Sequence, residues 1–393
     1  MGNVVEYDKD RIAFLRRHHE TYGDIFSFDE HVVLNIDPQR THEILAATNR
    51  DYLTELPPFA GRPDLAGASA QIKPWMAARK ALRPALTGTA MDGRIVDILA
   101  RLLTATDQRE VDVLPLMLDV AAHTVTELCL GASGSGIPAL LGENLAAAKP
   151  FEEMDYQLPA WLPLPRNRRL FRVHRKTVET LTKLVETRRN GGTDLLGVLL
   201  ATDLSPRSVM TTLRGILLGG HGVPAAALTS IVRELATRPD LMRDLADEAG
   251  AGVPRANLPL AEAVVKETLR LCPPVWMMTR VALTAVDLDR WTLAPGDEVL
   301  SSPYLIHRDP RWWPRAEVFD PERWFSERPV LGTYLPFGAG PRYCVGASLA
   351  MRQLTLSTSL LAQRFRPCSP RAALAEPDFC GRLAPAGLRA RFG

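Results

Sequence analysis

The chain has 393 residues, 46% of them hydrophobic and 23% charged, with a formal net charge of +2. These proportions are typical of a globular protein with a sizeable core, and so small a charge argues against nucleic acid or an anionic membrane as a partner. Five cysteines without CxxC spacing indicate a reducing setting. The first residues resemble no signal segment, and no uninterrupted apolar run approaches the roughly 18 residues of a membrane span. We therefore expect a soluble, cytoplasmic protein.

The predicted elements are mainly helical. An amphipathic helix is expected over residues 8–23, and residues 25–28 and 32–35 follow as two short strands of a hairpin. From about residue 39 to 250 nearly every segment has helical periodicity. The remaining strand-like and turn-like segments are 278–300, 330–336 and 376–393. The sequence therefore predicts a mainly α (α+β) fold, a large helical body with a small β-rich side, in a single domain.

One long helix is expected over residues 205–236. Ser205 is suited to cap its N-terminus, and Pro206 is suited to its first turn. Pro224, within the helix, removes one backbone N–H and clashes with the carbonyl of Gly220. The sequence therefore predicts a kink and an unpaired carbonyl at the centre of this helix.

An ion pair is expected on a later, largely apolar helix. Glu267 and Arg270 are three residues apart in AEAVVKETLRLCPP and so share a helix face. Such a pair is usually solvated and contributes little to stability. Its apolar neighbours favour a buried pair instead, which fixes geometry and leaves a costly unpaired charge if one partner is removed.

Residues 337–346 read FGAGPRYCVG and carry the most informative pattern of the chain. Cys344 lies between flexible glycines and the start of a helix, where backbone amides and the positive helix end face its sulfur. Arg342 lies two residues earlier. This combination offers one thiolate to an iron and one cation to a carboxylate.

The decapeptide resembles the haem-binding loop of the cytochrome P450 superfamily, the haem-thiolate monooxygenases, and matches each fixed position of Phe-Gly-x-Gly-x-Arg-x-Cys-x-Gly. The resemblance covers roughly residues 20–393. It implies the cytochrome P450 fold, with haem b (iron protoporphyrin IX) between the long distal helix and the cysteine loop. We read residues 1–393 as one cytochrome P450 haem domain.

The resemblance also implies roles for individual residues. Cys344 would ligate the iron, and its thiolate would push electron density toward a distal oxygen. Trp75 and Arg79 are four residues apart on one predicted helix, so both donors can reach one haem carboxylate. A structural or solvated role is the competing interpretation for each residue alone. The implied haem contacts are Trp75, Arg79, Arg280, His307, Phe337, Gly338, Arg342, Cys344 and Gly346, and the implied structural network is Glu267, Arg270 and Arg323.

The long helix departs from the family pattern on the oxygen side, where we expect Gly220, His221, Gly222 and Val223. The family has an acid and a threonine where this chain has Gly222 and Val223. Neither side chain can carry a proton, although splitting bound dioxygen needs two. Three explanations compete: ordered water combined with a polar substrate group, peroxide as the oxidant, or an oxidative coupling, ring closure or rearrangement. A helix register shifted by one residue, with a role for His221, remains as a further alternative.

The substrate is expected to be a small organic molecule. The resemblance implies pocket walls at 57–72, 150–165, 275–279 and the turn near Leu383-Ala384. Bulky apolar side chains at 275–278 would form an adaptable wall, although core packing is an equally good interpretation for them. These residues are Val275, Trp276, Met277 and Met278.

Electrons are expected from ferredoxin and ferredoxin reductase, because no flavin or nicotinamide fingerprint occurs in the sequence. Lys80, Arg83 and Arg352 would lie on the cysteine face, where an acidic ferredoxin could dock, although a merely solvated basic face is the competing interpretation. The sequence thus predicts a haem-thiolate oxidoreductase that hydroxylates, couples or cyclises its substrate, as in bacterial secondary-metabolite biosynthesis. A peroxide-driven peroxygenase is the first alternative. A haem protein without monooxygenase turnover, either an isomerase or a substrate-presenting partner, is the second.

Overall fold

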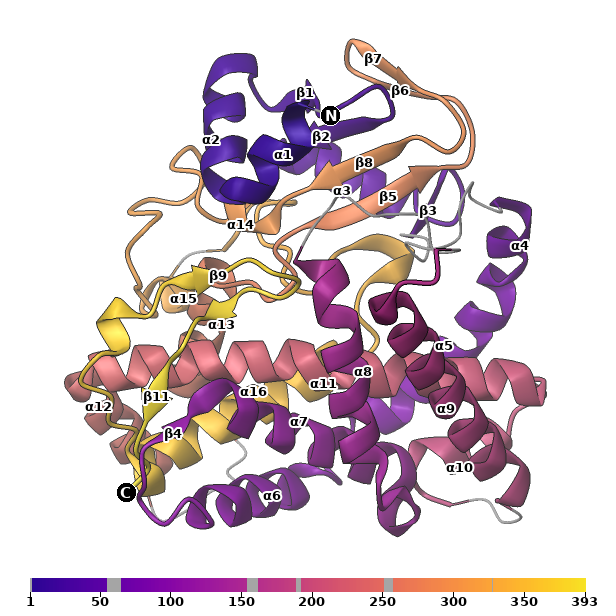
Figure 1. The fold of residues 1–393 in the computed structure, drawn as a ribbon. Coiled ribbons are helices and arrows are strands. Elements are labelled where there is room, and N and C mark those ends of the chain that lie inside the picture. Colours follow the sequence, from indigo (N-terminus) through magenta and orange to yellow (C-terminus); the bar gives the residue numbers. More distant parts are fainter. Residues whose placement is uncertain (1, 55–64, 154–161, 189–191, 251–256, 327) are drawn as a thin grey trace.

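A computed structural model describes residues 2–54, 65–153, 162–188, 192–250, 257–326 and 328–393. Helices make up the larger part, and a small sheet with the N-terminal helices lies at one side (Figure 1). The predicted mainly α fold with a small β-rich side is confirmed.

The N-terminal segment forms two helices where the sequence analysis expected one. Helix α1 (Gly2–Lys9) ends before Asp10, whose side chain accepts a hydrogen bond from the N–H of Ala13 and so begins helix α2 (Arg11–Tyr22). Helix α2 ends at Gly23, whose φ of 85° lies in the left-handed region. An N-cap inside the expected helix therefore divides it.

A five-stranded sheet joins distant parts of the chain in the order β1-β2-β8-β5-β3. Strands β1 and β2 form the predicted antiparallel hairpin, β2 and β8 are parallel, and the other pairs are antiparallel. The strands are β1 (Ile25–Ser27), β2 (Val32–Asn35), β3 (Tyr52–Thr54), β5 (Met278–Ala282) and β8 (Glu298–Ser301). The sheet thus brings the segment around Arg280 beside the N-terminal third of the chain.

The helical body surrounds the largest apolar core, to which most of its helices contribute buried aliphatic side chains. Helix α3 (Pro38–Ala46) lies beside the sheet (Figure 1). The helices of the body are α4 (Leu65–Ala70), α5 (Ile72–Thr87), α6 (Asp92–Thr104), α7 (Val113–Leu130), α8 (Ile137–Glu152), α9 (Pro165–Thr187), α10 (Leu195–Leu200), α11 (Pro206–Thr237), α12 (Pro239–Ala249), α13 (Pro259–Leu271) and α16 (Ala347–Leu360). The short elements are α14 (Pro303–Ile306), α15 (Arg323–Ser326), β4 (Val111–Asp112), β6 (Val286–Leu288), β7 (Trp291–Leu293), β9 (Pro377–Asp378), β10 (Ala384–Pro385) and β11 (Arg389–Ala390).

Helix α11 is the long helix predicted from the sequence, and it crosses the helical body (Figure 1). The Ser205 side chain accepts a hydrogen bond from the N–H of Ser208, as expected of an N-cap. The helix continues through Pro224 without interruption. By length and composition α7 and α11 could each cross a membrane, but more than half of each is buried inside the protein, as in core helices.

Candidate active site

The cysteine loop, residues 337–346, has a backbone conformation that depends on glycine. Gly338 and Gly340 have φ angles of 69° and 68°. A Cβ at Gly340 would lie 2.2 Å from the carbonyl oxygen of Leu45, so no larger residue fits against α3 there. The N–H of Cys344 donates to the carbonyl of Phe337, 2.9 Å away, and closes the loop. These contacts hold the sulfur at the start of α16.

Cys344 is exposed, and its surroundings act on its thiol in opposite directions. Desolvation raises the pKa of Cys344, whereas a hydrogen bond from the Gly346 backbone and the charge of Arg79 lower it. Both lowering groups favour the thiolate, and coordination of a metal ion deprotonates a cysteine outright. The loop therefore presents a sulfur that can serve as a metal ligand.

Two arginines, one within the cysteine loop and one on α5, share one aromatic side chain. Arg79 of α5 donates to the carbonyl of Tyr343, and Arg342 Nε donates to Asn49 Oδ1 at 2.7 Å. Their guanidinium carbons lie 6.0 and 5.8 Å from the ring of Trp75. We call Trp75, Arg79 and Arg342 the cation cluster.

The cation cluster has no acidic partner in the described part of the chain. Burial and the neighbouring charge of Arg79 lower the pKa of Arg342 to about 10. Burial likewise lowers the pKa of Arg79. Two desolvated cations close together are unfavourable unless an anion binds between or beside them. The cluster therefore has the chemistry of a carboxylate-binding site.

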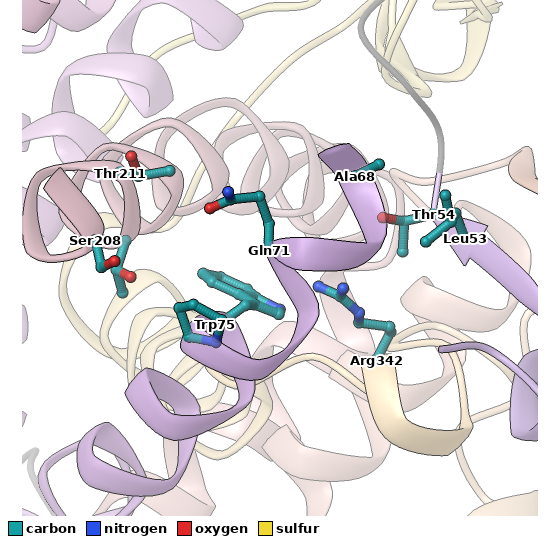
Figure 2. Close-up of a pocket in the computed structure, with 10 residues that line it drawn as sticks. Leu53, Thr54, Ala68, Gln71, Trp75, Ser208, Thr211 and Arg342 are labelled. Carbon is teal, nitrogen blue, oxygen red and sulfur yellow. The ribbon is translucent and has the colours of Figure 1, made fainter. Parts of the chain in front are cut away.

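A cavity of about 280 Å³ opens beside the cation cluster (Figure 2). Trp75 and Arg342 approach it from α5 and the cysteine loop, and hydroxyl side chains approach it from the first turns of α11. Its lining consists of Leu53, Thr54, Ala68, Gln71, Pro74, Trp75, Ser208, Thr211, Thr212 and Arg342. The cavity thus joins the start of α11 to the cysteine loop.

The face of α11 that is open differs from the one expected. Gly215 and Gly219 are exposed and Val223 is half-buried, and a Cβ at Gly219 would meet no atom within 4 Å. The ring of Trp75 lies 3.9 Å from the Cβ position of Gly215, on the same side as the cation cluster. Positions four residues apart share a helix face. The open face of α11 therefore carries almost no side-chain bulk.

Three of the four residues expected to line the oxygen side point into the protein instead. A Cβ at Gly220 would lie 2.6 Å from a methyl carbon of Val125 in α7, and His221 is buried. A Cβ at Gly222 would lie 2.8 Å from Nε of Arg382. Of the expected set only Val223 stays beside the open face. Four consecutive residues of a helix cannot all lie on one face, because successive side chains are about 100° apart around the helix axis.

The predicted haem contact at His307 does not fit the structure. Its Nε2 accepts a hydrogen bond from the N–H of Leu335 at 2.7 Å, and its Nδ1 lies 3.1 Å from the carbonyl of Arg270, to which it donates. Both ring nitrogens are thus used, and burial lowers the pKa of His307 to about 3. His307 is a neutral structural residue with no N–H left for a carboxylate.

Arg280 lies on β5, near the same edge of the site. Its Nε donates to the Thr48 hydroxyl at 2.9 Å, and its Nη1 donates to the carbonyl of Thr279 at 2.8 Å. Phe337 packs near Tyr343, with ring centroids 6.3 Å apart, and is half-buried against the main core. Both residues remain predicted haem contacts.

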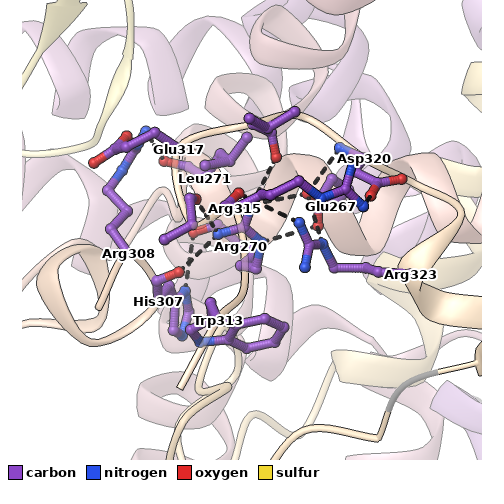
Figure 3. A network of polar contacts seen from close by, with 12 residues as sticks. Glu267, Arg270, Leu271, His307, Arg308, Trp313, Arg315, Glu317, Asp320 and Arg323 are labelled. Carbon is purple, nitrogen blue, oxygen red and sulfur yellow. Dashed lines mark hydrogen bonds and ion pairs between the residues drawn. The ribbon is translucent and has the colours of Figure 1, made fainter. Parts of the chain in front are cut away.

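Glu267 is the centre of a buried polar network between α13 and residues 307–324 (Figure 3). Its carboxylate accepts two hydrogen bonds from Arg270, at 2.8 and 2.9 Å, and one from Arg323, at 3.2 Å. Trp324 Nε1 and the backbone N–H of Asp320 donate to it as well, each at 3.0 Å. The remaining N–H groups of Arg270 reach backbone carbonyls between residues 307 and 318.

This network ties α13 to the irregular segment that leads to the cysteine loop. The side chains of Glu267 and Arg270 are both 0% exposed, so the pair is a buried one and not the solvated alternative. Trp324 was not expected from the sequence, because an indole N–H reaching a carboxylate 57 residues earlier leaves no local pattern.

The expected substrate wall is only partly open. Trp276 is buried in the second core and packs edge-on against Phe379, with ring centroids 5.3 Å apart. Met277 and Met278 are half-buried, and Met278 Sδ lies 3.9 Å from the Cβ position of Gly338. Val275 is 39% exposed. Trp276 thus follows the core interpretation, and the expected wall segments at 57–64 and 154–161 lie outside the described residues.

The residues present fit an iron porphyrin. The cysteine loop offers one sulfur donor, the cation cluster offers positive charge for carboxylates, and a Cβ at Gly219 on the open face of α11 would meet no atom within 4 Å. The hydroxyl-bearing residues of the cavity and Asn49 were missed by sequence analysis, because only the fold brings α11, α5 and the segment between α3 and β3 together.

Replacing Arg79 or Arg342 by alanine is expected to weaken haem binding by about ten- to a hundredfold, since a hydrogen bond to a charged group contributes roughly 1.5–3 kcal/mol. The measurement is the rate at which haem transfers to excess apomyoglobin. Arg83→Ala is the matched control, because Arg83 lies one turn further along α5 and is exposed. Equal transfer rates in all three variants would contradict the assignment of the cation cluster.

Comparisons with known proteins give the family of this chain. The family model of cytochrome P450 matches residues 1–376. Cyclooctatin synthase of Streptomyces melanosporofaciens is 32% identical over 231 residues, 53% of this chain and 50% of that protein. Lanosterol 14-alpha demethylase of Bos taurus is 30% identical over 226 residues, 52% of this chain and 45% of that protein. The chain spans about half the length of the curated relatives it matches.

Solved structures share the fold at lower identity. Retinoic acid-bound cyanobacterial CYP120A1 has a TM-score of 0.84 at 22% identity, covering 100% of this chain and 96% of that one. The haem domain of cytochrome P450DA has a TM-score of 0.80 at 19% identity, covering 99% and 95%. With the match of the family model over nearly the whole sequence, these findings identify the family: the chain belongs to the cytochrome P450 family.

Proposed function

We propose that this chain is a single haem domain, residues 1–393, which holds haem b through Cys344 and oxidises a small apolar organic molecule. The observation that carries the proposal is the exposed Cys344 sulfur beside a cation cluster that lacks acidic partners among the described residues. When bound, the haem would supply activation of an oxygen-based oxidant. The cation cluster would bind the haem carboxylates. The glycines on the open face of α11 leave space beside that helix, and the contacts of Gly340 and Cys344 hold the cysteine loop in place.

The names of the relatives and the lining near the cysteine loop support the proposed substrate class. Cyclooctat-9-en-7-ol 5-monooxygenase of Streptomyces melanosporofaciens is 31% identical over 52% of this chain. Half-buried methionines near the cysteine loop suit an apolar ligand of irregular shape. We therefore propose hydroxylation or oxidative cyclisation of a cyclic hydrocarbon or its alcohol, in bacterial secondary metabolism and in the cytoplasm.

One comparison of oxidants tests this proposal. Cyclooctat-9-en-7-ol is the first probe, incubated either with ferredoxin, ferredoxin reductase, NADPH and isotopically labelled dioxygen, or with hydrogen peroxide alone. Label in an oxidised product would support the monooxygenase. Product with peroxide only would favour the peroxygenase, which the missing acid and threonine at Gly222 and Val223 make the second candidate. A spectral shift on binding without product from either oxidant would favour the isomerase or substrate-presenting alternative.

The electron donor is proposed to be a ferredoxin that docks on α5. Lys80 and Arg83 are exposed, whereas Arg352 is paired with Asp92, Nε to Oδ1 at 3.0 Å, and so contributes less free charge. Arg83→Glu is expected to slow reduction by ferredoxin about tenfold at low salt and less at high salt, because charge complementarity steers association. Stopped-flow reduction measures this rate.

Arg175→Glu is the control for this test. Arg175 is 75% exposed on α9, which packs on α8 and α11 and not beside the cysteine loop. Equal reduction rates for Arg83→Glu and Arg175→Glu, with unchanged haem content, would remove α5 from the docking surface.

A further inference from the structure

Helix α11 lacks an acidic side chain at Gly222, yet a carboxylate lies close to this position. A Cβ at Gly222 would lie 2.8 to 3.1 Å from the Nε, Cδ and Cζ atoms of Arg382, so the arginine side chain lies directly against the helix. Arg382 belongs to the segment before β10, and its Nη1 donates to Glu152 Oε1 at 3.2 Å. Glu152 is the last residue of α8.

A second glycine makes room for the same pair. Gly381 has a φ of 73°, and a Cβ there would lie 2.3 Å from Glu152 Oε2. The carboxylate therefore rests on the backbone of residue 381 while its arginine rests on the backbone of residue 222. Any side chain at either glycine would displace the pair.

The backbone around the pair is anchored from the N-terminal side. Arg11 of α2 donates to the carbonyls of Glu152 and Phe379, at 3.2 and 3.1 Å. The N–H of Leu383 donates to the carbonyl of Pro274 at 3.1 Å. Fixed ends on both sides hold Glu152 and Arg382 in one arrangement.

The pair also reaches solvent. The side chains of Arg382 and Glu152 are 30% and 27% exposed, so one side of the pair touches water while the other touches α11. His221, the neighbouring titratable residue of α11, is buried, and burial with the charge of Arg382 lowers its pKa to about 4. His221 is therefore neutral near pH 7, and Glu152 is the carboxylate available at this place.

We propose that Glu152 and Arg382 form a positioning pair that supplies, from α8 and the C-terminal segment, the carboxylate that α11 lacks at Gly222. Arg382 orients Glu152 beside the centre of α11, and Glu152 passes protons from solvent to water near that helix. For each proton that Glu152 releases to water near α11, its carboxylate takes up one proton from solvent. The pair thus returns to its starting state. This inference rests on the proposed oxygen-dependent oxidation, in which the oxidant is dioxygen and the electrons come from ferredoxin.

Two oxidants separate proton delivery from structural damage. Reduction of dioxygen draws its protons from solvent, whereas hydrogen peroxide brings its protons with it. Glu152→Gln is expected to slow the ferredoxin-driven oxidation of cyclooctat-9-en-7-ol by roughly 10²-fold, the usual size of an acid–base effect, and to change the peroxide-driven rate by less than about twofold. The dependence of the dioxygen-driven rate on pH should also differ between Glu152→Gln and the wild type.

Charged neighbours also contribute to such a profile, so the comparison needs a matched control. The described charged or titratable groups around the pair are Asp8, Arg11, Lys149, Glu153, His221, Asp378 and Cys380. Glu143→Gln serves as the control, because Glu143 lies on the same helix and is also ion-paired, with Lys176 at 2.8 Å. It should leave both rates and the pH profile unchanged.

A second experiment moves the carboxylate from Glu152 to position 222 of α11. Gly222→Glu combined with Glu152→Gln displaces Arg382 from the backbone of residue 222, places the new carboxylate within reach of its guanidinium, and is expected to restore at least a tenth of the wild-type dioxygen rate. Thermal unfolding of Glu152→Gln, Arg382→Ala and their double variant, measured without turnover, should show that the two substitutions are not additive.

A changed unfolding temperature of Glu152→Gln, with an unchanged dioxygen-driven rate and pH profile, would give the pair a purely structural role. That result would overturn the inference. Equal losses with both oxidants would overturn it as well. If the wild type oxidised cyclooctat-9-en-7-ol neither with dioxygen nor with hydrogen peroxide, the proposed function would be contradicted. The inference, which rests on it, would be contradicted too.

Discussion

Cys344→Ser is expected to abolish oxidation both with ferredoxin and dioxygen and with hydrogen peroxide. A serine oxygen is a harder ligand than a thiolate sulfur and does not push electron density toward a distal oxygen as a thiolate does. The main-chain hydrogen bond from residue 344 to Phe337 and the positive φ angles of the loop do not depend on the sulfur, so the fold should be retained. The measurement is product formation together with the haem absorbance spectrum.

Cys368→Ser is the matched control for this variant. Cys368 is also an exposed free cysteine, but it lies beyond α16, where its backbone pairs with Arg391. Its spectrum and activity should equal those of the wild type. Retained activity and an unshifted spectrum in Cys344→Ser would mean that another group ligates the iron.

Glu267→Gln is expected to destabilise the fold by about 3–5 kcal/mol, because it leaves two buried arginines without their carboxylate. Native domains are stable by only about 5–15 kcal/mol, so much of the protein would be isolated unfolded or without haem. Glutamine keeps the shape of the side chain, which confines the change to charge and hydrogen bonding. Urea unfolding followed by circular dichroism measures the free energy of unfolding.

Glu262→Gln on the same helix provides the comparison. Glu262 pairs with Lys266 at 2.6 Å, but the two side chains are 50% and 34% exposed, and such surface pairs contribute about 0–1 kcal/mol. A similar, small loss of stability in the two variants would show that burial of the Glu267 network has no special energetic weight.

The features that the sequence predicted well depend on neighbours in the chain. Ser205 and Pro206 begin α11 because capping needs only the next three residues. The hairpin of β1 and β2 follows from two short apolar runs and a turn. Glu267 and Arg270 meet because they lie one helical turn apart.

The features that the sequence could not predict join distant segments. Arg382 lies against Gly222 across 160 residues, and neither position has a local pattern that names the other. His307 resembles a haem contact in sequence, but both of its ring nitrogens bond to the backbone, of Arg270 and of Leu335. The open face of α11 needed helix periodicity combined with knowledge of which side packs on α7.

The measurement that tests the central claim most directly is the absorbance of the reduced, carbon monoxide-bound wild-type protein. We expect a Soret band strongly shifted to the red, at the position typical of thiolate ligation, because the loop holds Cys344 beside the Gly346 amide and Arg79. A band at the position typical of histidine or protonated-thiol ligation would contradict ligation of the iron by a Cys344 thiolate.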